Sequence, residues 1–167
     1  EKGKTTEKLT RVGDSNETGT NVRFLADDTI FESLDYSYET LEKRLREIAF
    51  LTKGLKITIE DRRDEENVKK AEFCFEGGLK SFVEYLNKNK EKLHPEPIYI
   101  ERNGETPVEI AIQYTTAYTE NIHTFVNNIN TVEGGTHLEG FKRALTKVFN
   151  DYARSHNILK EKDNNLQ

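Results

Sequence analysis

The chain has 167 residues, of which 34% are hydrophobic and 33% charged, and its formal net charge is −5. This length supports one or two small domains with a real core. The acidic balance excludes a bulk basic footprint for nucleic acid, although 25 Lys and Arg residues leave room for a local basic face. Seven Tyr and nine Phe in patterned runs exclude a fully disordered chain.

The first elements expected along the chain are a strand and a helix. A strand is expected over residues 19–27 because apolar residues alternate there, namely Val22, Phe24 and Ala26. A helix is expected over residues 38–53, with Ser37 capping its start and Gly54 ending it. Its inward-facing residues are expected to be Leu41, Leu45, Ile48 and Leu51.

The middle of the chain alternates between strand and helix patterns. Strands are expected over residues 55–63 and 71–76, joined by a charged loop, and a helix over residues 77–90. A β-hairpin is expected over residues 98–115, turning at an Asn-Gly pair, and one further strand over residues 119–129. The helix is expected to bury Leu79, Phe82, Val83 and Leu86.

The last helix is expected to run from His137 to about His156. Thr136 is the expected N-cap, and Glu139 completes a capping box. The Gly-Gly pair before it frees the backbone to turn sharply from strand to helix, and the same device precedes the earlier helix in FEGGLKSF. The apolar stripe of the last helix consists of Leu138, Phe141, Leu145, Val148 and Tyr152. These two strand–Gly-Gly–helix units predict a sheet covered by helices.

Few residue patterns point to chemistry. The sequence contains no P-loop, no GxGxxG and no HExxH motif. Cys74, in the alternating run EFCFE, is expected to be an inert core residue of a strand, and one thiol builds neither a disulfide nor a CxxC metal site. The four histidines have no ligand spacing, so no metal site is expected; they are His94, His123, His137 and His156.

Membrane and secretion signals are also missing from the sequence. No run approaches the ~20 apolar residues that cross a bilayer, and no signal peptide is recognisable, so no membrane partner is expected and the expected compartment is the cytoplasm. The chain lacks Met, opens with EKGKTTEKLT and finishes with KEKDNNLQ, a polar run that is expected to close no structure. We therefore expect an excerpt of a longer protein.

Four blocks of the sequence resemble a known family. The blocks are TGTNVRFLADDTIFE, LEKRLREIAFLTKGLKITIEDRR, FEGGLKSFVEYLNKNK and NNINTVEGGTHLEGFKRAL. In this order they are similar to the B subunits of bacterial DNA gyrase, from about Thr18 to about Asn165. The related B-type subunits of topoisomerase IV, which support decatenation, share the pattern and stay as an alternative.

The resemblance implies an α+β fold with two partial domains. Residues 1–76 are expected to be the C-terminal portion of a gyrase/Hsp90-type (GHKL) ATPase sandwich, and residues 77–167 the N-terminal portion of a ribosomal-S5-like transducer domain. The parent is implied to be an ATP-dependent type II DNA topoisomerase, an isomerase that couples ATP binding and hydrolysis to strand passage and negative supercoiling. Its implied partners are double-stranded DNA, an A subunit in an A2B2 complex, and a second B subunit on ATP binding.

The resemblance also assigns candidate binding residues. Thr20 is implied to lie beside an adenine pocket and Val22 to form one of its apolar walls; taken by itself, the TGT run fits an ordinary strand-entry turn. No catalytic residue is expected in this chain, because the family's water-activating glutamate, Mg²⁺-holding asparagine and Gln-Thr-Lys loop find no match here. ATP and Mg²⁺ are therefore expected to bind the parent protein, and the chain alone is expected to be inactive.

DNA contact is the least defined implication. Relatives often carry a basic residue just before EGGTH, where this chain has Val132, which cannot contact phosphate. The candidate DNA-facing residues are instead Lys142, Arg143 and Lys147, which also fit an ordinary helix surface. Two readings from other classes remain open here: an independent S5-like nucleic-acid-binding module and a protein-interaction domain without catalytic ancestry.

Overall fold

The structure is a computed structural model that describes residues 3–22 and 26–167, and the chain forms two units, Glu1–Tyr36 and Ser37–Gln167. The first unit has neither helix nor strand in its described residues. The strand expected over residues 19–27 is wrong at Val22 and Ala26, which lie in irregular backbone, while Phe24 lies outside the described residues. Alternation forms a strand only where a second strand pairs with it, and no strand in the described part of the chain does so here.

The second unit begins with helix α1 (Tyr38–Leu51). Ser37 caps it as expected, because its hydroxyl accepts a hydrogen bond from the Thr40 N–H at 3.2 Å. The buried face is not the expected stripe: Phe50 is 2% exposed, whereas Leu41 is 41% exposed. The reason is that β1, β2 and α2 pack on α1 and decide which side loses solvent.

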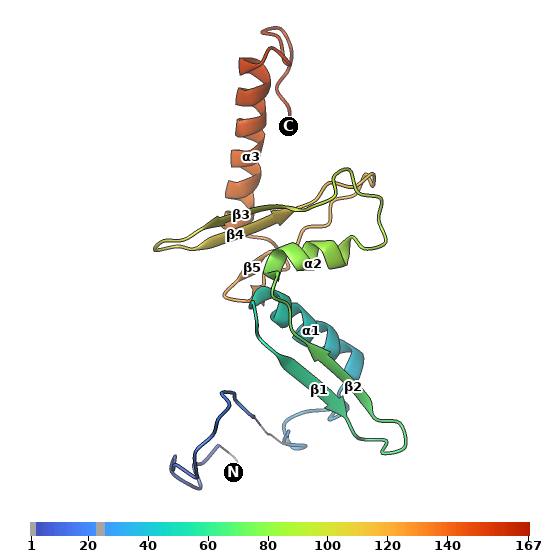
Figure 1. The fold of residues 1–167 in the computed structure, drawn as a ribbon, viewed down its shortest axis with the longest axis vertical. Helices are drawn as coiled ribbons and strands as arrows, with labels where there is room; N and C mark the ends of the chain where they lie inside the picture. The colour runs from blue at the N-terminus through green and yellow to red at the C-terminus, as the bar shows by residue number, and fades with distance from the viewer. Residues whose placement is uncertain (1–2, 23–25) are drawn as a thin grey trace. The chain divides into compact units, whose positions relative to one another are not determined.

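An antiparallel hairpin of β1 (Ile57–Asp61) and β2 (Lys69–Phe73) lies along α1 (Figure 1). The loop between the strands is exposed, as expected. The expectation that Cys74 is a buried strand residue is wrong, because β2 ends at Phe73 and the exposed Cys74 follows it. The chain leaves the ladder there to turn into the next helix.

Helix α2 (Gly78–Leu86) packs against α1 through aromatic rings. The Phe50 ring stacks on Phe75 with a centroid distance of 3.6 Å, and the rings of Phe82 and Tyr85 lie 5.1 and 5.4 Å from it. Phe73, at the end of β2, lies 6.4 Å from Phe75. We call these five residues the aromatic cluster; it is the core that joins α1, β2 and α2.

The expected hairpin after α2 is confirmed. Strands β3 (Ile98–Arg102) and β4 (Val108–Ile112) pair antiparallel, with Ile98 opposite Ile112, and β4 packs on α2. The reversal occupies residues 103–107 and includes the Asn-Gly pair.

The next segment differs from its expectation of one strand over residues 119–129. It is a small hairpin of β5 (Phe125–Val126) and β6 (Ile129–Asn130). Asn127 and Asn128 adopt φ angles of +50° and +64°, which are typical of a two-residue hairpin turn. The described residues thus contain three separate two-stranded sheets rather than one sheet covered by helices.

The last helix, α3 (Thr136–Ser155), begins one residue earlier than expected. Its N-cap is Gly135, which makes no side-chain capping bond, so the expected capping box of Thr136 is wrong. Thr136 already has helical backbone, and the sharp entry is made by φ angles of +79° at Gly134 and +150° at Gly135. The stripe is half-buried in its first half, but Val148 and Tyr152 are exposed.

The C-terminal segment runs back beside α3 (Figure 1), contrary to the expectation that it closes nothing. The Asn150 side chain donates to the Leu166 carbonyl at 3.0 Å and accepts from the Leu166 N–H at 2.8 Å. The Arg154 guanidinium donates to the Asp163 carbonyl at 3.0 Å and to the Asn165 side chain at 2.6 Å. These hydrogen bonds hold the tail against α3.

Candidate functional site

A groove lies between α3 and the C-terminal tail and has a volume of about 440 Å³. The three candidate DNA-facing residues all lie in its lining: Lys142 and Arg143 are adjacent in α3, and Lys147 lies one turn after Arg143. The lining consists of Lys142, Arg143, Thr146, Lys147, Asn150, Asp151, Asn165 and Leu166. Three cations and one carboxylate give this groove a net positive charge.

The three cations differ in how they are paired. Lys142 lies 3.3 Å from a Glu120 carboxylate oxygen, and Lys147 forms an ion pair with Asp151 one turn along the helix. Both pairs are largely exposed, so each contributes little to stability and exchanges readily for another anion. Arg143 forms no ion pair within residues 3–22 and 26–167, which leaves its guanidinium open to a phosphate.

The candidate adenine-pocket residues lie in the first unit. Thr20 is exposed, and the Val22 side chain is 78% exposed. The structure does not bring Thr20 and Val22 together with the α3 groove in one unit. Their role in nucleotide binding stays a prediction.

Val132 lines a second, smaller cavity of about 260 Å³ near the start of α3 and is 87% exposed. The lining contains no Lys or Arg; its members are Ile122, His123, Thr124, Asn130, Thr131, Val132, Gly134 and Leu138. The Thr124 and Thr131 hydroxyls lie 2.6 Å apart and satisfy one another. This cavity therefore offers no charge to a phosphate, in contrast to the α3 groove.

Sequence reasoning missed the role of Lys53. Its ammonium donates to the Tyr99 hydroxyl at 2.8 Å and lies 3.1 Å from Glu109 and 3.7 Å from Glu101. The Tyr99 hydrogen bond, followed by that of Glu109, raises the pKa of Lys53 above its ordinary value. We call Lys53, Tyr99, Glu101 and Glu109 the Lys53 clasp. No sequence signal joins residue 53 to residues 99–109, because the pairing depends on the tertiary fold.

Two arginines of α1 also reach segments far along the chain. Arg46 donates to the Tyr85 hydroxyl at 2.8 Å, and its guanidinium lies over the Phe73 ring at 5.0 Å from the centroid. Arg44 donates to the Asn128 carbonyl at 2.7 Å, at the β5–β6 turn. Both arginines therefore make tertiary contacts.

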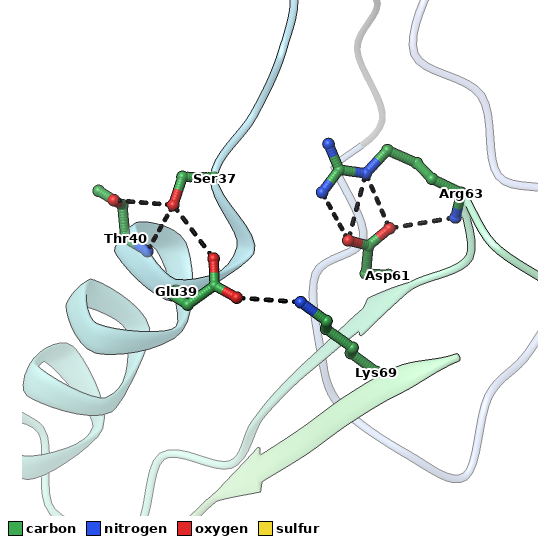
Figure 2. A network of polar contacts seen from close by, with 6 residues as sticks. All are labelled: Ser37, Glu39, Thr40, Asp61, Arg63 and Lys69. Carbon is green, nitrogen blue, oxygen red and sulfur yellow. Dashed lines mark hydrogen bonds and ion pairs between the residues drawn. The ribbon is translucent and has the colours of Figure 1, made fainter. Parts of the chain in front are cut away.

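The start of α1 is tied to the β1–β2 hairpin by a polar network (Figure 2). Glu39, in the first turn, accepts from the Lys69 ammonium at 3.0 Å, and this contact lowers the Glu39 pKa. Asp61 accepts from the Arg63 guanidinium at 2.6 Å, which lowers the pKa of Asp61 to about 2. Both carboxylates therefore stay charged well into the acidic range.

Two further kinds of feature are absent from the part of the chain that the structure describes. It contains no group of three or more His, Cys, Asp or Glu side chains that could hold a metal ion. None of its helices is both long and apolar enough to cross a membrane.

Comparison with known proteins identifies the chain. Residues 78–167 match the family model described as DNA gyrase B. The B subunit of the Clostridium acetobutylicum DNA gyrase is 53% identical over 167 residues, which is 99% of this chain and 26% of that protein. The B subunit of the Staphylococcus aureus DNA gyrase is 54% identical over 160 residues, 95% of this chain and 25% of that protein. The chain thus spans about a quarter of the length of these relatives.

Solved structures agree with the sequence comparison. The 43K ATPase domain of Thermus thermophilus gyrase B, in complex with an aminocoumarin, superposes with a TM-score of 0.67 at 36% identity, covering 82% of this chain and 37% of that one. The B subunit of the Myxococcus xanthus DNA gyrase gives a TM-score of 0.68 at 28% identity, covering 74% and 39%. The fold is thus a mixed α+β arrangement resembling the gyrase B ATPase and transducer region. The chain belongs to the DNA gyrase B family.

Proposed function

We propose that this chain is the coupling segment of the B subunit of an ATP-dependent type II DNA topoisomerase, in which ATP binding and hydrolysis drive strand passage and negative supercoiling. The observation that carries the proposal is the 53% identity to a DNA gyrase B protein over nearly the whole chain. The parent acts in the cytoplasm on double-stranded DNA, with an A subunit and a second B subunit as its partners.

The proposal divides the chain at residue 76. Residues 1–76 belong to a GHKL-type ATPase domain, and residues 77–167 to an S5-like transducer. Support comes from the family match, which starts at residue 78. The aromatic cluster draws Phe50, Phe73 and Phe75 from the first portion and its other two rings from the second. A shared core lets a movement of one portion displace the other as a rigid body.

ATP and Mg²⁺ belong to the parent rather than to this chain alone. Thr20 and Val22 form one side of the adenine pocket, and the groups that activate water come from elsewhere in the parent. Calorimetry of the 167-residue chain with Mg-ATP is expected to show no binding. Micromolar binding by the chain alone would contradict this placement. In the complete B subunit, Thr20→Ala is expected to weaken ATP binding, whereas the control Thr10→Ala leaves it unchanged.

The α3 groove is the proposed DNA contact. The support is that Lys142, Arg143 and Lys147 line one groove and that each is exposed. Replacing all three by Ala in the complete B subunit is expected to weaken DNA binding and to lower its log–log salt slope by about 0.9 for each phosphate that the protein no longer neutralises. The matched control replaces Lys88, Lys90 and Lys92, which removes the same charge outside the groove. Equal losses in both triple variants, measured by filter binding at several salt concentrations, would show that only bulk charge matters.

A further inference from the structure

The Lys53 clasp lies where three elements meet. Lys53 follows the end of α1, its stem runs over the first residue of α2, and its ammonium reaches β3 and β4. A Cβ placed on Gly78 would lie 2.7 Å from Cε and 2.9 Å from Cγ of Lys53, so the stem occupies the space of the missing side chain. Gly78 also adopts a φ of +56°. The Gly-Gly pair therefore leaves room for the Lys53 side chain as well as allowing the turn into α2.

The acceptors of the clasp belong to both strands of one hairpin. Tyr99 and Glu101 lie on β3, and Glu109 lies on β4. The Tyr99 hydroxyl lies 3.0 Å from Glu101 and 2.9 Å from Glu109, so this one hydroxyl contacts both carboxylates as well as the ammonium. The ammonium also lies 5.0 Å from the Tyr99 ring centroid. Lys53 thus links both strands of the hairpin to the α1–α2 junction, in addition to the packing of β4 on α2.

The clasp differs from the other lysine ion pairs of this unit. Lys56, three residues further on, pairs with Glu72 at 3.1 Å, and these two side chains are 63% and 53% exposed. The Lys53, Glu101 and Glu109 side chains are 41%, 39% and 33% exposed, and Lys53 has three acceptors rather than one. Pairs such as Lys56–Glu72 contribute little. The clasp has the geometry to set the position of an element.

We propose that Lys53 is a positioning residue for ATP-coupled strand passage, holding the β3–β4 hairpin to the end of α1 so that a movement of α1 carries the hairpin with it. This rests on the proposed function, because the clasp joins residue 53, in the ATPase portion, to residues 99–109 in the transducer portion. Lys53 touches neither nucleotide nor DNA in this role, so it acts on coupling rather than on binding.

The test uses the complete B subunit with its A subunit and relaxed plasmid. Lys53→Ala is expected to lower the supercoils introduced per ATP hydrolysed by about threefold to tenfold, with an unchanged KM for ATP. Tyr99→Phe is expected to give a smaller loss, because the ion pairs of Lys53 with Glu109 and Glu101 remain, and the double variant no loss beyond that of Lys53→Ala. Lys53→Arg is expected to restore most of the coupling, and the control Lys56→Ala to behave as wild type.

The outcomes separate the two proposals. Coupling as in wild type for Lys53→Ala, or an equal loss for Lys56→Ala, overturns the role of the clasp. A wild-type complex that hydrolyses no ATP and introduces no supercoils overturns the proposed function instead. In that case, amide hydrogen exchange of residues 98–112 in the 167-residue chain still tests the clasp: it is expected to quicken in Lys53→Ala but not in Lys56→Ala, and unchanged exchange in both overturns it.

Discussion

The aromatic cluster and helix α3 use the same kinds of side chain with opposite results. Phe50 is 2% exposed, whereas Phe149 and Tyr152 of α3 are 46% and 56% exposed. Both helices carry apolar residues at helical spacing, but α1 has β1, β2 and α2 against it. The second half of α3 instead meets a polar tail that hydrogen bonds with it. Apolar periodicity thus predicts a helix but not its burial.

The largest expected effect tests the cluster against α3. Phe50→Ala is expected to lower the free energy of unfolding by about 3–5 kcal/mol, because it removes a ring enclosed by other rings. Phe149→Ala is expected to change it by about 0.5 kcal/mol, as at other exposed sites. Urea denaturation followed by circular dichroism measures both. Similar losses of unfolding free energy in the two variants would contradict the difference in burial between the aromatic cluster and α3.

Two glycines sharpen the same comparison. Gly78→Ala is expected to destabilise the chain by about 1–3 kcal/mol, because the residue has a φ of +56° and the Lys53 stem fills its side-chain space. Gly140, inside α3, has nothing within 4 Å of an added Cβ, so Gly140→Ala is expected to stabilise by about 0.5–1 kcal/mol. Thermal denaturation of both variants checks this, and a gain at Gly78 would contradict it.

The C-terminal tail is held to α3 by side-chain hydrogen bonds. Asn150→Ala is expected to cost about 1–2 kcal/mol, because Asn150 is 7% exposed and its side chain holds both the N–H and the carbonyl of Leu166. Limited proteolysis is expected to cut residues 160–167 faster in this variant. The exposed Asn89→Ala serves as the control, and equal tail cleavage in both variants would mean that Asn150 does not hold the tail.

The smallest expected effect is a loss of stability at acidic pH. The folded-state pKa of Asp61 lies at about 2, below its ordinary 3.8, so its contribution to stability is present above about pH 4 and is lost as the pH falls toward 2. Glu39, whose pKa is also lowered, adds to this loss. Asp61→Asn is expected to be less stable than wild type at pH 7 and to converge with it near pH 2. A difference that stays constant across this range, measured by melting temperature, would exclude the Asp61–Arg63 contact as its cause.

Much of the local structure could be predicted from the sequence. The α1 helix with its Ser37 cap, the β1–β2 and β3–β4 hairpins and the positions of α2 and α3 follow from periodicity and turn residues, which act over a few neighbours. The wrong predictions concern residues whose burial or backbone conformation depends on segments far away in the sequence. Cys74 is exposed because β2 ends before it, and Asn127 and Asn128 turn the chain where one strand was expected.

The candidate site shows the same division. Lys142, Arg143 and Lys147 could be grouped from the sequence because two neighbouring turns of one helix carry them. The Lys53 clasp could not be predicted from the sequence. Lys53 lies 46 to 56 positions before its partners, and they meet only through the packing of α1, α2 and the β3–β4 hairpin. The contact between the tail and α3 was missed because its hydrogen bonds use the Asn150 amide and the Arg154 guanidinium, and such contacts follow no periodic sequence pattern.

By itself, the sequence determined the family and the order of helices and hairpins, because long matched blocks and short-range periodicity are written directly in the residue order. Only the tertiary structure decided which apolar residues are buried, why Gly78 has no side chain, and which cations have partners. The physical reason is that burial and ion pairing depend on the atoms that close over a residue, and in this chain those atoms come mostly from distant segments.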